Sequence, residues 1–510
     1  MRPVAAACLA VAGLIAAGTP ALAQEDSAAA AASGSGRSGF SVSPRISVSE
    51  TWTDNLRLTG DGYQDRALVT SVTPGVSVSS RSGVFRGTLD YSLDAIVYTK
   101  SDSKNRVQNQ MNGRGTAELV PQALFVDVIG NISQQSISAF GTQSPSNELD
   151  NANRTETRQL QVSPYWRGLL LGSATFELRA SGTIRDNSET TGGNGNTKEG
   201  TLSFSLSGPQ GRALNWGLQA NTTRQHYEQT GLDYRSSMGL GSLTWVPDVD
   251  VQLGVNGGVE RNDYLGAETT TIYGVSGKWT PTPRTSLSAD WQHHNYGASH
   301  NFRFEHRMAR FVVRAVSTQS VNTGASPDGQ LNNYGLLDLQ FSALEPDPVK
   351  RDILVRTTLA ALGLKPDGIS NAGFLANTAM LQRRSEVSMA WSGQRLTVTL
   401  GLNDNNSRAL GVAPSGSGDL SLSDNVRQRG ATVSVAYRLT PTASSTLTAN
   451  RQHSAGDGGL GGDTTSLYFT TTVRLGARTD ASLGLRHTRS DDQFLAYREN
   501  AVFATLTQRF

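Results

Sequence analysis

The sequence predicts an all-β transmembrane fold: one large antiparallel β-barrel of about 22 strands, within a range of about 18 to 24. Three observations predict it. Apolar and polar residues alternate with a period of two, short turns alternate with long loops, and no apolar run after the N-terminus reaches the roughly 20 residues of a membrane-spanning helix. The first predicted strand shows the alternation, with Phe40, Val42, Ile46 and Val48 interleaved with Ser41, Ser43, Arg45 and Ser47.

The composition agrees with strands that have one apolar face. Of the 510 residues, 37% are hydrophobic and 17% are charged, and there are 53 glycines but only 17 prolines. Both percentages are low for a globular enzyme of this length, whereas half-apolar strands joined by turns have such values. The formal net charge of +2 is close to neutral. It gives no support to a nucleic-acid partner.

The N-terminus has the three parts of an export signal. Arg2 supplies the positive charge, residues 4–17 form an apolar core, and Ala21-Leu22-Ala23 is a small-x-small cleavage site. We therefore expect a signal peptide over residues 1–23. The single cysteine, Cys8, lies within it, so the exported chain is expected to have no disulfide and no thiolate metal site.

The remaining chain divides into a linker, a barrel and an insertion in that barrel. Residues 24–38 are small and polar, which predicts a flexible linker, and residues 39–510 carry the strands. Residues 317–378 interrupt the strand pattern. The linker is too short for an N-terminal plug domain, which argues against an importer of the TonB-dependent class.

The last strand is predicted to close the barrel. Val502, Ala504 and Leu506 share one face with the final residue, Phe510, and the opposite face is polar. A terminal aromatic residue on such a strand resembles the signal that the barrel-assembly machinery reads in bacterial outer-membrane proteins. Pairing of this strand with the first would remove both sheet edges. We therefore expect localisation in the outer membrane of a Gram-negative bacterium, with outer-membrane lipid around the barrel.

Five tryptophans indicate which end of the barrel is periplasmic. Each lies within a few residues of a predicted short turn and on or near the apolar face of its strand, as in an aromatic girdle at the periplasmic interface. They are Trp166, Trp216, Trp245, Trp279 and Trp391. An even number of strands places both ends of the barrel on the periplasmic side.

Several short segments follow one another in the same order as in one known family. They include Trp52-Thr53-Asp54-Asn55-Leu56, Ser163-Pro164-Tyr165-Trp166, Glu260-Arg261-Asn262-Asp263 and Pro346-Asp347-Pro348 with Arg351. Together they resemble the outer-membrane β-barrel family associated with PEP-CTERM and exosortase exopolysaccharide systems. The resemblance covers nearly the whole exported chain. It implies an outer-membrane protein that takes part in production or export of an exopolysaccharide.

The insertion at residues 317–378 is predicted to contain a helix. Asp347 suits the N-cap and Pro348 the first helical position, and the helix is expected to continue through Arg351 and Ile353 to about residue 362. Two interpretations remain open. The insertion either folds into the pore as a plug or gate, or it forms an external cap without consequence for transport.

Arginines on the predicted lumen face are the candidate ligand-binding residues. They are Arg86, Arg179, Arg314, Arg395, Arg438, Arg474 and Arg486. Solvation of a polar pore wall explains them by default. The alternative concerns the last three, which are expected to have few acidic neighbours and so to guide an anionic polysaccharide.

We find no catalytic constellation, and therefore expect no enzyme activity, no cofactor and no metal. The sequence has no nucleophile elbow, no phosphate-binding loop and no zinc-protease helix. His293, His294 and His300 are near one loop, but nothing predicts that they converge on a metal. The glycine-rich Asp457–Asp463 is expected to be a loop.

The leading functional hypothesis is a pore-forming barrel that serves exopolysaccharide export, with the polymer and other envelope export proteins as partners. A second hypothesis is a non-conducting structural or docking barrel of the same envelope assembly. An outer-membrane hydrolase ranks below both, because no catalytic residues are evident.

Overall fold

The computed structural model describes most of the predicted barrel. The described residues are 39–99, 101–188, 195–209, 211–266, 268–324, 373–411, 418–492 and 496–510, together with 334, 337, 338, 351 and 355. The predicted signal peptide (residues 1–23), the whole of the predicted linker (24–38), and Asp347, Pro348 and Ile353 lie outside them.

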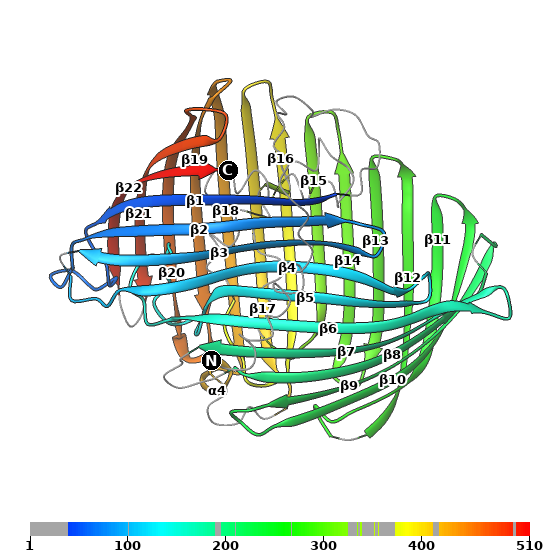
Figure 1. Cartoon of the computed structure of the whole chain (residues 1–510). Helices are drawn as coiled ribbons and strands as arrows, with labels where there is room; N and C mark the ends of the chain where they lie inside the picture. The colour runs from blue at the N-terminus through cyan, green and yellow to red at the C-terminus, as the bar shows by residue number, and fades with distance from the viewer. Residues whose placement is uncertain are drawn as a thin grey trace.

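The described residues form one closed sheet of 22 strands, which confirms the predicted fold class (Figure 1). Each strand pairs antiparallel with the next along the chain, and the last pairs with the first. The strands are β1 (Phe40–Thr53), β2 (Ala67–Arg81), β3 (Phe85–Thr99), β4 (Arg106–Val120), β5 (Leu124–Ser136), β6 (Arg154–Leu170), β7 (Ala174–Ser188), β8 (Thr197–Ser207), β9 (Leu214–Tyr227), β10 (Asp233–Asp248), β11 (Val251–Asn262), β12 (Glu268–Thr282), β13 (Thr285–His294), β14 (Gly297–Arg307), β15 (Phe311–Asn322), β16 (Met380–Ser392), β17 (Leu396–Ala409), β18 (Asn425–Thr440), β19 (Ala443–Ala455), β20 (Gly461–Arg474), β21 (Thr479–Asp492) and β22 (Tyr497–Arg509).

Two short helical elements in the loops have described bounds. They are α4 (Asp419–Leu422), between β17 and β18, and the 3₁₀ turn η1 (Asp457–Gly459), between β19 and β20. No helix among the described residues is long and apolar enough to span a membrane.

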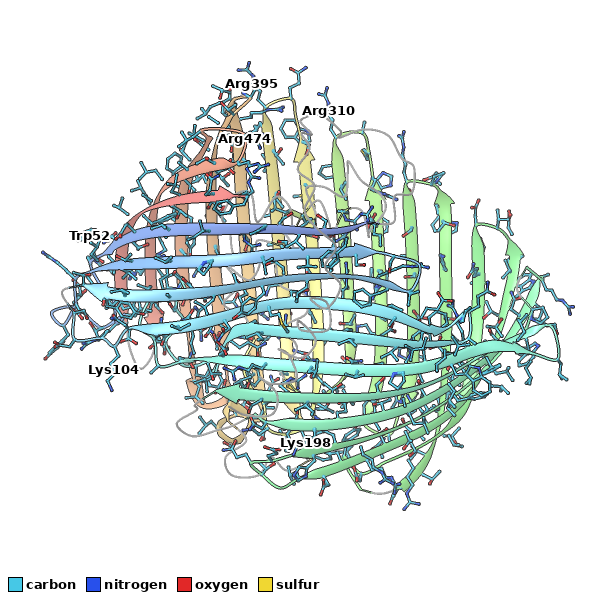
Figure 2. All side chains as sticks on the ribbon, in the orientation of Figure 1. Trp52, Lys104, Lys198, Arg310, Arg395 and Arg474 are labelled. Carbon is cyan, nitrogen blue, oxygen red and sulfur yellow. The ribbon has the colours of Figure 1, made fainter. Side chains whose placement is uncertain are left out.

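The two ends of the barrel differ in their connections. The start of β1 and the end of β22 lie at the end with short turns, where the Phe510 amide donates to the Pro44 carbonyl at 3.0 Å. In Figure 2, Arg310 and Arg395 mark this turn end, and Trp52, Lys104 and Lys198 mark the opposite, loop end. By the pattern of outer-membrane barrels the turn end is periplasmic and the loop end extracellular.

The longest interruption is shorter than the sequence predicts. β15 continues to Asn322 and β16 begins at Met380, so residues 317–322 belong to the wall rather than to the insertion. The sequence boundary was misplaced because the outward residues Ser317 and Gln319 are polar. At the loop end a strand has left the hydrocarbon layer, so its outer face no longer needs apolar side chains. The insertion therefore spans residues 323–379.

The outer surface carries the apolar belt that a membrane requires. On β22, Val502 and Leu506 are exposed while Glu499 on the other face is fully buried. The five girdle tryptophans are also exposed, near the turn end. A closed sheet with no unpaired edge and an apolar outer belt can satisfy every backbone group within lipid. The chain is thus an outer-membrane barrel.

A buried ion pair stands beside the closing strand pair of β1 and β22. Arg486 donates from Nη2 to Glu499 Oε1 at 2.7 Å and from Nε to Oε2 at 3.0 Å. Thr53 Oγ1 of β1 donates to the same carboxylate at 2.8 Å. The side chains are 4% and 0% exposed, so the charges depend on each other for compensation.

We predict that Glu499→Gln lowers the free energy of unfolding by about 3 to 5 kcal/mol, because it leaves the buried Arg486 guanidinium without a counter-charge. Urea unfolding in lipid vesicles measures the change. The matched control is Asp491→Asn, whose pair with Arg489 is more than half exposed and should cost less than about 1 kcal/mol. The double substitution Arg486→Met with Glu499→Leu should recover most of the loss. An unchanged midpoint for Glu499→Gln would contradict the role of the pair.

Candidate functional site in the lumen

The two predicted lumen arginines of the first strands occupy different settings. Arg86 is exposed near the turn end of β3, on the face that it shares with Asp90. Arg179 of β7 pairs with Asp127 at 2.6 Å and with Glu177 at 2.9 Å, and its guanidinium lies 3.9 Å from the ring centroid of Tyr165. These contacts lie within the wall, so Arg179 packs against neighbouring strands and does not only keep the pore wall polar.

The arginines of the last strands do not form an open cationic track. Arg474 is within 3.7 Å of Asp480 and Arg486 is paired with Glu499. The expectation of few acidic neighbours is therefore wrong for both, because the partner strand supplies a carboxylate that a single strand's pattern does not show. Arg438 is exposed and contacts the Gln394 carbonyl. Arg395 precedes β17 in an exposed turn and is not on a strand's lumen face.

Arg314 of β15 has a different role, because it contacts the insertion. It shares its face with the fully buried Val312 and pairs in register with the buried Ser388, which identifies that face as the lumen side. Its Nη1 lies 3.2 Å from Asp338 Oδ2, and its Nη2 lies 3.3 Å from Glu305 on β14. A carboxylate of the insertion is thus held against the barrel wall.

Asp338 also joins two parts of the insertion. Arg351 donates from Nε to Asp338 Oδ1 at 2.7 Å, so one carboxylate is shared between Arg351 and Arg314. Residues 337, 338, 351 and 355 are helical, and Arg351 and Val355 are buried. Of the four predicted gate residues, Arg351 alone is described; it lies in the lumen beside Asp338.

The position of this contact along the barrel separates the two interpretations of the insertion. β15 runs from the turn end at Phe311 to the loop end at Asn322, and Arg314 lies near its beginning. The eight residues from Arg314 to Asn322 correspond to about 26 Å along the strand. Asp338 therefore lies deep in the periplasmic half of the lumen. An external cap does not account for a contact at that depth.

The two ends of the insertion contact another part of the wall. The Thr323 carbonyl accepts a hydrogen bond from Tyr227 Oη of β9 at 2.7 Å, and Thr323 Oγ1 donates to Glu199 of β8 at 3.2 Å. On the return, Asn377 Nδ2 donates to Gln229 at 2.8 Å. β9 lies six strands from β15, so both ends of the insertion contact a part of the wall that is not adjacent to the strands they join.

A second inward segment is the loop of residues 137–153 between β5 and β6. Hydroxyls of three strands bind its backbone: Tyr98 Oη donates to the Glu148 carbonyl at 2.9 Å, Tyr468 Oη donates to the Pro145 carbonyl at 2.8 Å, and Tyr497 Oη contacts the Gln143 carbonyl. The sequence pattern alone assigns this loop no role. The signal that could have found it is the recurrence of inward tyrosines near the loop end.

Apolar residues of the loops pack together over the mouth. They are Ala139, Phe140, Phe374, Ala376, Met380, Leu420 and Val426. Asp419 at the start of α4 fastens this cluster to the 137–153 loop, since its carboxylate accepts hydrogen bonds from Ser138 Oγ at 2.6 Å and from the Ala139 amide at 2.5 Å. Burial raises the pKa of the Asp419 carboxyl to about 6.

The loop packing at Asp419 should weaken as pH rises. The folded pKa of about 6 exceeds the unfolded value of about 3.9, so the favourable contribution is complete below pH 4 and is lost as pH rises through 6, up to about 3 kcal/mol. Hydrogen exchange of residues 138–140 and 418–423, corrected for intrinsic rates, should be faster at pH 8 than at pH 5. Asp419→Asn should abolish the difference. Equal protection at both pH values would contradict the assignment.

The described residues contain no group of three or more histidine, cysteine or carboxylate side chains placed to hold a metal. His294 is buried, with Nδ1 2.8 Å from Glu260 and Nε2 3.0 Å from Ser299. His300 instead lies 3.0 Å from Ser317 on β15, and the ring of His293 packs on Tyr273. The three histidines therefore have separate partners.

Comparison with known proteins gives structural similarity alone. No protein-family model and no curated protein matches the sequence. The FrpB iron transporter of Neisseria meningitidis is similar over 92% of this chain and 81% of its own, with 10% identity and a TM-score of 0.49. The siderophore receptor PirA of Pseudomonas aeruginosa covers 92% and 80%, with 10% identity and a TM-score of 0.42. At these values the similarities carry no information on function.

Proposed function

We propose that this chain is a gated outer-membrane pore that exports a hydrophilic polymer, an exopolysaccharide of a PEP-CTERM/exosortase-type system. The observation that carries the proposal is the ion-pair network Arg314–Asp338–Arg351, which fastens described residues of the insertion inside the lumen. Barrels of about 22 strands are wide enough to need such an obstruction if they are not to leak. The identity of the polymer rests on the sequence resemblance.

The chemistry of the wall suits a sugar chain. On β18–β21 the lumen face carries cross-strand pairs of hydroxyls: Ser434 with Thr448 at 3.1 Å, Ser466 with Thr488 at 3.2 Å, and Thr464 with Ser490 at 3.1 Å. Hydroxyl groups both donate and accept, so they can exchange partners with sugar hydroxyls. These six residues are at most 5% exposed, so a sugar would reach them only after the inward segments withdraw. On the lumen face of these strands Arg474 and Arg486 lie beside carboxylates, and Arg438 contacts a backbone carbonyl. This pairing favours a weakly charged polymer over the strongly anionic one that a track of open arginines would select.

The covered mouth also fits the second hypothesis, a non-conducting docking barrel. The buried apolar cluster around Phe140 and Leu420 holds the loops at this end together, so that their outer faces would form a preformed surface for an envelope partner. The two hypotheses differ in the strength of the insertion's attachment. A gate must release from the wall, whereas a docking barrel can keep it in place permanently.

We predict that Asp338→Asn increases single-channel conductance or opening frequency in planar bilayers, because it removes the charge that both Arg314 and Arg351 neutralise. Each hydrogen bond to a charged group contributes about 1.5 to 3 kcal/mol, so losing the charge in two of them should raise the open population by at least about tenfold. Deletion of residues 337–366 should give a permanently larger conductance.

The matched control is Asp127→Asn, which removes a carboxylate paired with Arg179 within the wall and away from the insertion. It should leave gating unchanged. Deletion of residues 337–366 without any rise in conductance would exclude the plug and favour the docking barrel.

Cross-linking tests whether release of the insertion is needed for export. In a Cys8→Ala background, Arg314→Cys with Asp338→Cys can be joined by a cleavable bis-thiol reagent. We expect a deletion strain that carries this variant to secrete polymer without the reagent, to stop when it is added, and to recover after cleavage. Single-cysteine variants treated in the same way are the controls. Undiminished secretion from the cross-linked strain would contradict gating by this segment.

A further inference from the structure

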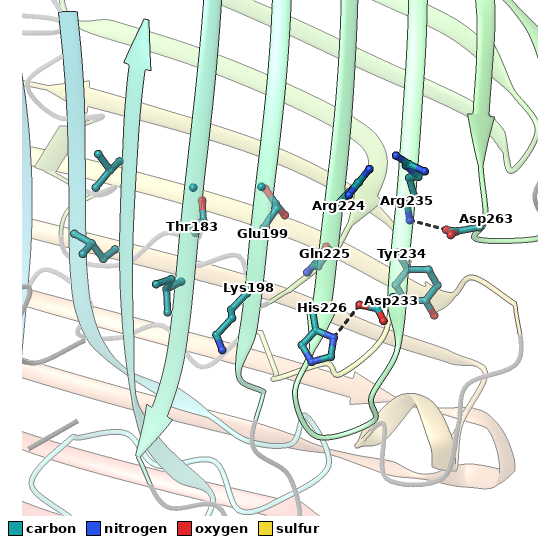
Figure 3. A pocket seen from close by; sticks show the side chains of 15 residues that line it. Thr183, Lys198, Glu199, Arg224, Gln225, His226, Asp233, Tyr234, Arg235 and Asp263 are labelled. Atoms are coloured by element: carbon teal, nitrogen blue, oxygen red, sulfur yellow. Dashed lines mark hydrogen bonds and ion pairs between the residues drawn. The ribbon is translucent and has the colours of Figure 1, made fainter. Parts of the chain in front are cut away.

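The outer surface of β6–β11 has a basic cluster at its extracellular end, away from the lumen. Lys198, Arg224, His226 and Arg235 line a cavity of about 740 Å³, together with Leu160, Val162 and Ile184 (Figure 3). Their faces follow from the alternation of the strands. Arg224 has the same parity as the exposed Trp216 and Leu218 on β9, and Arg235 has that of Leu243 and Trp245 on β10.

Two of these cations stand opposite each other, and the carboxylates of Asp233 and Asp263, which also line the cavity, form no ion pair with either guanidinium. Arg224 and Arg235 are register partners on β9 and β10. No described carboxylate oxygen lies within 4.0 Å of either guanidinium. Like charges directly opposite on adjacent strands destabilise a sheet, unless an anion lies between them.

The other charges nearby are engaged elsewhere. Lys198 pairs with Glu228 at 2.7 Å and His226 with Asp233 at 2.8 Å, while an Asp263 carboxylate oxygen accepts from the Arg235 backbone amide at 2.8 Å. The guanidinium groups of Arg224 and Arg235 are therefore the ones available to a ligand.

The same row of register partners across the strands also contains a notch, that is, a gap in the outer surface where two glycines have no side chain. Gly182, Gly200, Arg224 and Arg235 follow each other across β7–β10 in register. A Cβ built on either glycine would meet no atom within 4 Å, so both strands leave open space on that row. Leu160, Val162 and Ile184 border the space on the side away from the arginines. One site thus offers two guanidiniums next to an apolar bank, the surface formed by Leu160, Val162 and Ile184.

Arg224 and Arg235 lie at the level of the lipid headgroups along the barrel axis. Arg235 is ten residues from the girdle residue Trp245 on the same strand. At about 3.4 Å per residue and a strand tilt of about 40°, the two differ by about 26 Å in height, close to the roughly 25 Å of the apolar band. The arginines therefore lie at the outer-leaflet interface, opposite the tryptophan girdle.

We infer that this surface binds a phosphate-bearing lipid of the outer leaflet, with the phosphate between Arg224 and Arg235 and an acyl chain in the notch at Gly182 and Gly200. The guanidinium fork matches phosphate oxygens in pairs, and the apolar bank matches a hydrocarbon chain. In a Gram-negative outer membrane the phosphorylated glycolipid lipid A has this combination. The inference is independent of what the lumen transports.

Native mass spectrometry of the delipidated full chain in neutral detergent tests it, with diphosphoryl lipid A as the probe. We expect the wild type to retain one lipid A and to bind the dephosphorylated lipid more weakly. Arg224→Gln with Arg235→Gln should lower lipid A affinity by at least about tenfold, because two charge-assisted contacts are lost.

The matched control is Arg284→Gln with Arg310→Gln, an equal change of charge in the periplasmic turns, and it should bind as the wild type does. Gly200→Leu supplies a second variant, because it fills the notch without changing charge and its backbone has no positive φ. It should also weaken binding. Heat-modifiable migration of each variant on gels verifies folding.

Three results would overturn the inference. They are equal binding of phosphorylated and dephosphorylated lipid, equal loss in the control pair, and displacement of lipid A by inorganic phosphate alone at a concentration near that of the lipid. The last would show a general anion site instead of a lipid site.

Discussion

Closure of the sheet is the constraint on which the rest of this structure depends. Within hydrocarbon each backbone N–H and C=O must find a partner in the protein, and a sheet can meet that demand only if its first and last strands pair. β1 and β22 do so over nine register pairs, from Arg45 with Arg509 to Thr53 with Ala501. Once the wall is closed, one face must suit lipid and the other must suit water, and the alternation of residues along every strand follows.

Closure also decides where polar chemistry can occur. Side chains that could not be exposed to lipid collect on the inner face, where they pair with one another across strands, as Arg486 does with Glu499 and Arg45 does with Asp90. This pairing leaves few free charges on the described wall. We therefore place the proposed gate in a segment that enters the lumen, and Asp338 shows how such a segment is attached.

The barrel could be predicted from sequence because the alternation of apolar and polar residues in each strand distinguishes its lipid face from its lumen face. Phe40 to Val48 and Val502 to Leu506 are sufficient for that, and the count of 22 strands follows from repeating the pattern. Contacts between distant segments could not be predicted in the same way. Nothing near Arg314 in the chain signals Asp338, and the carboxylates beside Arg474 and Arg486 come from a neighbouring strand. The end of β15 was misplaced because polar outward residues near the extracellular interface resemble a loop.

The segment at residues 323–379 has a consequence for the order of assembly. A closed barrel cannot be threaded by a segment whose two ends are fixed in adjacent strands, unless the segment enters through the mouth. That mouth is covered by the 137–153 loop, whose backbone is bound by Tyr468 of β20 and Tyr497 of β22. Residues around Asp338 should therefore reach Arg314 while the sheet is still open, before the last two hairpins fold over. Slow final closure would then be a property of this chain, set by how quickly its interior is filled.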